Sequence, residues 1–126
     1  MFERIDPRSS TPLYAQIAAQ IRSAVASGEL RPAAALPSVR ELAGDLRVNP
    51  ATVVQAYREL EAEGFVEIRH GAGTFVRELA PARRSRERAR QARAIVQRLL
   101  TEARRHGVSL HELRDAIDAE IGVEAT

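Results

Sequence analysis

The sequence predicts a mainly α-helical protein with one small β-hairpin. In several segments apolar residues recur at spacings of three and four, and these segments start or end at residues that commonly cap helices. Two short runs of strand-forming residues, 66–68 and 75–76, lie on either side of a glycine-rich turn. Two closely spaced helices followed directly by a hairpin form the pattern of a winged helix-turn-helix.

The length and composition fit a small protein in two parts. The chain has 126 residues, of which 44% are apolar, and it contains no cysteine. We expect a winged helix-turn-helix domain at 1–78 and a helical dimerisation region at 79–126. No apolar run approaches the roughly 20 residues of a membrane span, and the charged N-terminus lacks a signal-peptide core. A cytoplasmic protein without a membrane partner is therefore expected.

The first helix is expected to have Thr11 as its cap and Pro12 at its first helical position, and to end near Gly28. Residues 2–5 have the composition of a short strand that pairs with the sheet edge. The buried stripe of the helix recurs every four residues, at Leu13, Ile17, Ile21 and Val25.

Two short helices follow, separated by a connection so short that it forces a sharp angle, as in a helix-turn-helix. The first starts at Ser38, which forms a capping box with Glu41. The second starts at the N-cap Asn49, with Pro50 at its first helical position. Gly64 stands where a left-handed residue commonly ends a helix. The buried face of the second helix is expected to hold Val53, Ala56, Tyr57 and Leu60.

The opposite face of this second helix is expected to read DNA, because the first turn of a recognition helix reaches base edges in the major groove. Thr52 and Gln55 can hydrogen-bond to bases, and the Ala51 methyl can meet a thymine methyl. Arg58 lies on the same polar face. The alternative is an ordinary helical hairpin whose polar face is solvated.

The turn of the hairpin has the composition of a DNA-contacting wing. Gly71 and Gly73 allow positive φ angles and leave no side chain between the backbone and a neighbour. Arg69 and His70 suit a contact to phosphate or to the minor groove. The alternative is a plain glycine turn. The hairpin follows directly after the two helices, and this position favours the wing.

The runs LPSVRELA, VNPATV and AYRELEAEGFVEIRHGAGTFV resemble the DNA-binding domain of GntR-family bacterial transcription regulators over residues 12–76. The short remainder resembles the YtrA-like subfamily, whose C-terminal part is a small helical dimerisation unit. The resemblance implies that Arg40 contacts DNA from the second helix of the domain, that the recognition helix starts at Asn49, and that His70 lies in the wing. Pro50 stands where many relatives carry an arginine that reads guanine.

The charge distribution places a condition on this interpretation. Residues 1–76 carry a net charge of −1, so Arg40, Arg58 and Arg69 must share one face, while nearby acids must face away. These acids are Glu61, Glu63 and Glu67. The complete set expected to contact DNA is Ser38, Arg40, Asn49, Ala51, Thr52, Gln55, Arg58, Arg69, His70, Gly71 and Gly73.

Two further helices are expected after Pro81. The first spans 82–106 and ends at Gly107, and the second is capped by Ser109 in a capping box with Glu112. Two short amphipathic helices bury too little surface to be stable alone, so a second copy is expected to complete a four-helix, two-fold interface. The expected interface residues are Ala92, Ile95, Val96, Leu99, Leu100, Ala103, Leu110, Leu113, Ile117 and Ile121.

The stretch Arg83–Arg93 is rich in arginine and has almost no apolar face, which leaves three interpretations. It forms a solvated helix face, it touches the DNA backbone between half-sites, or it pairs with acids of the last helix across the interface. Those acids are Asp115, Asp118 and Glu120.

The sequence gives no sign of a reaction centre. It has no phosphate-binding glycine loop and no nucleophile elbow, and we expect His70, His106 and His111 to lack a carboxylate or second histidine at metal-ligand spacing. We therefore expect no enzyme, no metal and no cofactor, while a small-molecule effector is possible but unsupported. The predicted function is a dimeric repressor on an inverted-repeat operator in double-stranded DNA. The alternatives are a non-specific DNA-coating protein that uses Arg83–Arg93, or a winged helix that binds another protein.

Overall fold

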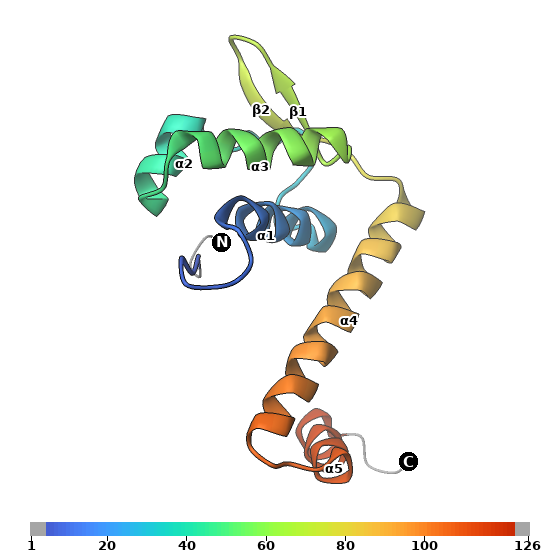
Figure 1. Cartoon of the computed structure of the whole chain (residues 1–126). Helices are drawn as coiled ribbons and strands as arrows, with labels where there is room; N and C mark the ends of the chain where they lie inside the picture. Colours follow the sequence, from blue (N-terminus) through green and yellow to red (C-terminus); the bar gives the residue numbers. More distant parts are fainter. Residues whose placement is uncertain (1–4, 123–126) are drawn as a thin grey trace. The chain divides into compact units, whose positions relative to one another are not determined.

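The computed structural model describes residues 5–122 and divides the chain into two compact units, 1–88 and 89–126. The sequence placed the domain boundary earlier, after residue 78. Seven elements follow one another along the chain (Figure 1): α1 (Leu13–Ser27), α2 (Val39–Leu46), α3 (Pro50–Ala62), β1 (Val66–Arg69), β2 (Gly73–Val76), α4 (Pro81–Arg105) and α5 (Leu110–Ile121). The expected class, mainly α with a small β-wing, is confirmed.

The start of α1 differs from the expectation. Pro12 is the N-cap, with an extended ψ of 149°, and no side chain caps the helix, so Thr11 is not the cap. The Thr11 N–H instead donates to Ser9 Oγ at 3.1 Å, and the Gln16 side-chain amide donates to the carbonyl of Thr11 at 2.9 Å. These two bonds pair the backbone N–H and carbonyl of Thr11, and its hydroxyl does not cap the helix. The end at Gly28 is confirmed by its φ of 87°.

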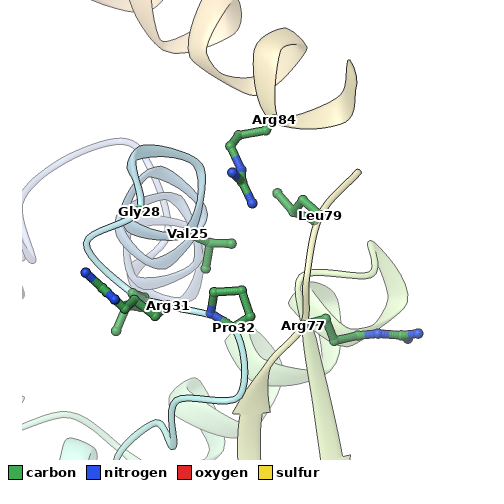
Figure 2. Close-up of a pocket in the computed structure, with 8 residues that line it drawn as sticks. Val25, Gly28, Arg31, Pro32, Arg77, Leu79 and Arg84 are labelled. Carbon is green, nitrogen blue, oxygen red and sulfur yellow. The ribbon is translucent and has the colours of Figure 1, made fainter. Parts of the chain in front are cut away.

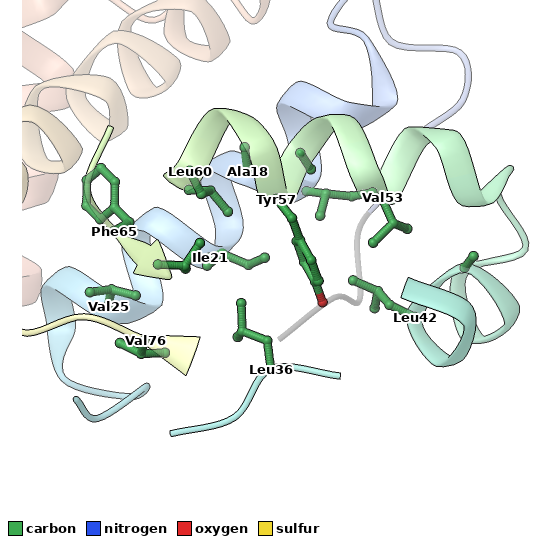
Figure 3. Packing of buried hydrophobic residues seen from close by; sticks show 14 of the residues in the cluster. Ala18, Ile21, Val25, Leu36, Leu42, Val53, Tyr57, Leu60, Phe65 and Val76 are labelled. Carbon is green, nitrogen blue, oxygen red and sulfur yellow. The ribbon is translucent and has the colours of Figure 1, made fainter. Parts of the chain in front are cut away.

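The apolar stripes of α1, α2 and α3 share one core, as the sequence predicted. Figure 3 shows Ile21 of α1 and Leu60 of α3 facing each other, with Phe65 at one end and Leu42 of α2 toward the other. All four predicted α3 residues are buried. Fully burying such a side chain contributes about 1.5–3 kcal/mol, so this core is the main source of stability for the first unit.

The caps of the helix-turn-helix also match the sequence. The Glu41 N–H donates to Ser38 Oγ at 3.0 Å, and the Ser38 N–H donates to the Glu41 carboxylate at 3.1 Å. Asn49 Oδ1 accepts from the Ala51 N–H at 2.8 Å, with Pro50 as the first helical residue. Arg47, with a φ of 57°, provides the left-handed residue that turns the chain between the two helices.

The small sheet has a third segment that the sequence did not indicate. β1 and β2 pair antiparallel, and residues 33–36 line the free edge of β2 through an isolated bridge between Ala35 and Phe75. The Leu36 N–H donates to the Thr74 carbonyl at 2.8 Å, and the Val76 N–H donates to the Ala34 carbonyl at 2.9 Å. Of the expected N-terminal strand, residues 2–4 lie outside the described residues, and Ile5 belongs to no strand.

The second unit consists of the later part of α4 together with α5. The helix α4 ends at Arg105, the His106 N–H still donates to the Glu102 carbonyl at 3.2 Å, and Gly107 follows with a φ of 69°. Ser109 and Glu112 form the expected capping box at the start of α5. No helix within residues 5–122 has the length and apolar character needed to cross a membrane.

Candidate nucleic-acid interface

The start of α3 presents short polar and apolar side chains away from the core. Ala51, Gln55 and Arg58 are exposed and Thr52 is half-buried, while Val53 and its stripe point inward. Asn49 is occupied as the N-cap, so its oxygen is unavailable to a base. The first two turns of α3 therefore offer the Ala51 methyl, the Thr52 hydroxyl and the Gln55 amide, which is a combination suited to base edges.

A groove of about 420 Å³ lies between α3 and the wing. Arg58 of α3 and His70 of the wing both line it, so the fold brings these two predicted contacts together. Its lining is Val39, Val54, Tyr57, Arg58, Glu61, Ile68, His70 and Thr74.

Tyr57 fixes the position of α3 at the base of this groove. Its hydroxyl donates to the Pro37 carbonyl at 2.7 Å, directly before the capping residue Ser38. Burial, with a smaller contribution from the negative charge of Glu41, raises the pKa of Tyr57. The hydroxyl therefore stays a neutral donor and holds the loop before α2 against α3.

Glu61 and Glu63, two of the three acids expected to face away from DNA, make contacts within the first unit. The Glu61 carboxylate accepts from the Ile68 N–H at 2.9 Å. Glu63 Oε1 lies 2.8 Å from Arg22 Nη2 in a part-buried ion pair. The ion pair turns Glu63 toward Arg22. Glu61, in contrast, lines the groove together with Arg58 and His70, so the condition that the acids face away is not met for Glu61.

The third acid, Glu67, pairs with a residue that the sequence assigned to DNA. Its carboxylate lies 2.9 Å from Arg69 Nε, and the Arg69 guanidinium also lies over the Phe75 ring, 4.7 Å from its centre. Arg69 is the last residue of β1, and these two contacts place its side chain along the sheet. The predicted tip from Arg69 to Thr74 is too long, because Arg69, Gly73 and Thr74 all belong to strands.

The remaining predicted contacts fall on the same unit. Ser38 and Arg40 are exposed at the start of α2, and Gly71 lies at the tip of the hairpin with a φ of 78°. Gly73 has a φ of 127°, and a Cβ there would only touch the Phe75 ring, at 3.7 Å. The positive φ angles expected for both glycines are confirmed, whereas DNA contact by any single residue stays a prediction.

Comparison with known proteins decides the family. The model of the bacterial regulatory proteins of the gntR family matches residues 13–76, which is the span from α1 to β2. The chain belongs to the GntR family. It is 40% identical over 114 residues to the HTH-type transcriptional repressor YtrA of Bacillus subtilis (strain 168), covering 90% of this chain and 88% of that relative.

Solved structures of GntR-family proteins are similar as well. YtrA from Sulfolobus acidocaldarius, a GntR-family transcription factor, has a TM-score of 0.59 at 39% identity, covering 80% of this chain and 99% of that one. The AraR DNA-binding domain in complex with operator ORX1 has a TM-score of 0.52 at 32% identity, covering 56% and 88%. The predictions of a winged helix-turn-helix and of a DNA-binding transcription regulator are confirmed.

One cluster of this GntR-family chain was missed by the sequence reasoning. Arg83, in the first turn of α4, donates to the Glu63 carbonyl and lies over the Phe65 ring, 4.7 Å from its centre. Arg22 of α1 lies 5.7 Å from the centre of the same ring. Arg83 is therefore a structural contact within the first unit, and the arginine-rich start of α4 is not one continuous solvated face. Phe65 directly after Gly64 is the only local sequence signal for this cluster.

The expectation about the histidines is wrong for two of them. His106 Nε2 lies 3.1 Å from Glu102 Oε1, and His111 Nε2 lies 3.3 Å from Asp115 Oδ2, each at a spacing of four residues on one helix. Both are exposed two-residue pairs. Across residues 5–122, no group of three or more histidine, cysteine and acidic residues is placed to hold a metal ion.

Proposed function

We propose that this protein is a cytoplasmic, homodimeric, sequence-specific repressor that binds an inverted-repeat operator and catalyses no reaction. The observation that carries the proposal is the groove that Arg58 of α3 and His70 of the wing line together. The first turn of α3 enters the major groove, and the hairpin lies at the adjacent minor groove. The AraR domain, whose fold is similar, was solved with an operator, and the similar YtrA of Bacillus subtilis is described as a repressor.

The dimer part of the proposal rests on the exposed apolar face of the second unit. Leu110 is 67% exposed, Ile121 64% and Ile95 48%, although all three belong to helical apolar stripes. A hollow of about 330 Å³ on this face is lined by Leu100, Leu110, Leu113, Arg114 and Ile117. A contiguous apolar face of this kind marks an interaction site, and a second copy presents the same face.

The predicted interface residues play different parts within a single chain. Ala103 is buried, and Leu100 and Leu113 are half-buried, so these three pack between α4 and α5. Val96, Leu99 and Ile117 stay exposed and are available to the partner copy. Ala92 is exposed nearer the start of the helix. A two-fold dimer predicts half-sites about one helical turn apart.

The test is fluorescence anisotropy of the full chain on its own upstream DNA and on a scrambled duplex across a salt series. A preference of roughly a thousandfold or more for the upstream duplex supports the proposal. Equal binding to both duplexes that falls steeply with salt would instead indicate a non-specific coating protein. The exposed side chains of Arg86, Arg88 and Arg93 are the observation that supports this alternative. Absence of binding at low salt would favour the protein-binding alternative.

Two variants, measured in the same anisotropy experiment, test which residues contact DNA. Thr52→Ala should weaken specific binding by about 1–3 kcal/mol if Thr52 reads a base, and Arg40→Ala should lower the salt slope by about one if Arg40 contacts a phosphate. Thr101→Ala and Arg104→Ala, both on exposed positions of α4, are the matched controls. Wild-type binding by both test variants would show that the recognition surface is misassigned.

A further inference from the structure

A second pocket of the first unit lies where α4 begins, with a volume of about 330 Å³ (Figure 2). Its walls come from the end of α1, the following loop, the residues after β2 and the first turn of α4. Three arginines border it, Arg31, Arg77 and Arg84, and none of its eight lining residues is acidic. Glu29 and Glu78 are neighbours in sequence but do not line it. The lining residues therefore carry no negative charge, while the buried Glu87 lies three residues after Arg84 on α4.

Arg84 is the arginine that reaches into the pocket. Figure 2 shows its guanidinium directed from α4 toward Leu79, whereas the guanidinium groups of Arg31 and Arg77 point away from the pocket. The Nε of Arg84 is buried and has no hydrogen-bond partner among the described residues. Its neighbour Arg83, by contrast, is engaged with Glu63 and Phe65. A buried donor without an acceptor is unfavourable, so the site favours a ligand that supplies one.

The backbone at the end of α1 does not supply that acceptor. The Val25 carbonyl accepts from the Gly28 N–H at 3.3 Å, and the Ala24 carbonyl accepts from the Leu30 N–H at 3.0 Å. Both carbonyls are thus engaged by the turn that ends the helix.

The rest of the wall decides which anion fits. Val25 and Leu79 are buried apolar residues, and Pro32 and Leu30 extend the apolar wall. A guanidinium pairs with a carboxylate through two parallel hydrogen bonds, and the apolar wall suits a short hydrocarbon body. An inorganic phosphate would place further polar oxygens against apolar groups without partners. The volume lies at the lower end of ligand pockets, so the ligand is small.

We propose that this pocket binds a short-chain organic monocarboxylate, whose carboxylate pairs with Arg84 and whose hydrocarbon body lies against Val25, Pro32 and Leu79. None of the lining residues belongs to the set expected to contact DNA. The site therefore goes beyond the proposed function, and a test of ligand binding there does not depend on whether the protein binds DNA.

The experiment is thermal unfolding of the full chain with the sodium salts of acetate, butyrate, hexanoate and phosphate, each matched in ionic strength with sodium chloride. Butyrate or hexanoate should raise Tm saturably, on the order of 5 °C at about ten times the dissociation constant. Acetate and phosphate should raise it less. Butyrate should also shift the methyl NMR signals of Val25 and Leu79, which places the ligand directly.

Variants separate a site from a general salt effect. Arg84→Gln should weaken butyrate binding at least about tenfold, as expected for loss of one charged hydrogen-bonding partner. Arg86→Gln, an exposed neighbour outside the lining, should bind as the wild type does. If Arg84→Gln fails to fold, the methyl shifts of the wild-type chain decide the question. The proposal is overturned if no saturable rise exceeds that of chloride, if the methyl signals do not move, or if both variants lose binding equally.

Discussion

The helix α3 and the α4–α5 hairpin carry the same kind of apolar stripe but meet different surroundings. In α3, Val53 and Leu60 are completely buried against α1 and α2. In the hairpin, Ile95 and Leu110 belong to an equally regular pattern and stay largely exposed. Periodicity thus identifies a face that needs a partner, whereas only the rest of the chain or a second copy can provide that partner.

The largest effect is expected where the stripe is already covered. Leu60→Ala should lower the free energy of unfolding of the first unit by about 2–5 kcal/mol, because it removes buried methyl groups and leaves a cavity. Denaturant unfolding at two protein concentrations measures this loss. The loss should be the same at both concentrations, since the core lies within one chain; a strong dependence would contradict a self-contained first unit.

A substitution in the apolar stripe of the α4–α5 hairpin should weaken the association of two copies of the chain. Leu99→Asp places a charge in the proposed interface twice, once from each copy, and should weaken dimerisation by about a hundredfold or more. Sedimentation velocity across a concentration series measures the shift toward monomer. Gln97→Asp, with the same charge on a polar position of α4, is the control, and an equal shift in both variants would exclude a specific apolar interface.

A smaller effect is expected at the junction that ties α4 to α3. Gly64 has a φ of 84°, and a Cβ there would lie 2.8 Å from Arg83 Nη1. Gly64→Ala should therefore destabilise the first unit by about 1–2 kcal/mol through left-handed strain alone, with displacement of Arg83 adding to it. A double-mutant cycle with Arg83→Ala measures the second part. Strict additivity of the two variants would show that the Arg83 contact contributes nothing to the cost.

The two capping boxes give the smallest effects and compare the units directly. Ser38→Ala and Ser109→Ala should each cost about 0.5–2 kcal/mol, and helix content monitored during denaturation should show the loss in the first unit and in the hairpin respectively. A loss from Ser109→Ala that vanishes on raising protein concentration would agree with a hairpin stabilised by association.

The same boxes predict a dependence on pH. Backbone and side-chain hydrogen bonds from Ser38 hold the pKa of Glu41 below its ordinary value of 4.5, and Ser109 acts alike on Glu112. A carboxyl with a depressed folded-state pKa stabilises the fold above its unfolded pKa, and this stabilisation is lost as pH falls through the folded-state pKa. Glu41→Gln should therefore flatten the decline in stability below pH 4.5, as measured by thermal unfolding from pH 6 to 3. An unchanged slope would contradict this role.

Much of the fold followed from local patterns, because caps and stripes are encoded by neighbouring residues. Ser38, Asn49 and the buried face of α3 were all predicted correctly for that reason. Contacts between distant residues were not. The pairing of residues 33–36 with β2 and the stacking of Arg83 on Phe65 depend on tertiary packing that no local spacing reports.

The candidate site divides in the same way. The exposed first turn of α3 followed from its helical phase, whereas the pairing of Arg69 with Glu67 depended on how β1 places the two side chains. From the sequence, an arginine at a turn is expected to be an unpaired cation, whereas in the sheet Arg69 forms an exposed ion pair with Glu67 two residues away. The groove shared by Arg58 and His70 also required the hairpin to be placed beside α3.

The most direct test of the account is sedimentation equilibrium of the full chain at low micromolar concentration, with Leu99→Asp alongside. The account predicts a wild-type mass of twice the single chain and a variant mass close to one chain. A wild-type mass of one chain at tens of micromolar would contradict it, because the apolar face of α4 and α5 would then be stable without a second copy.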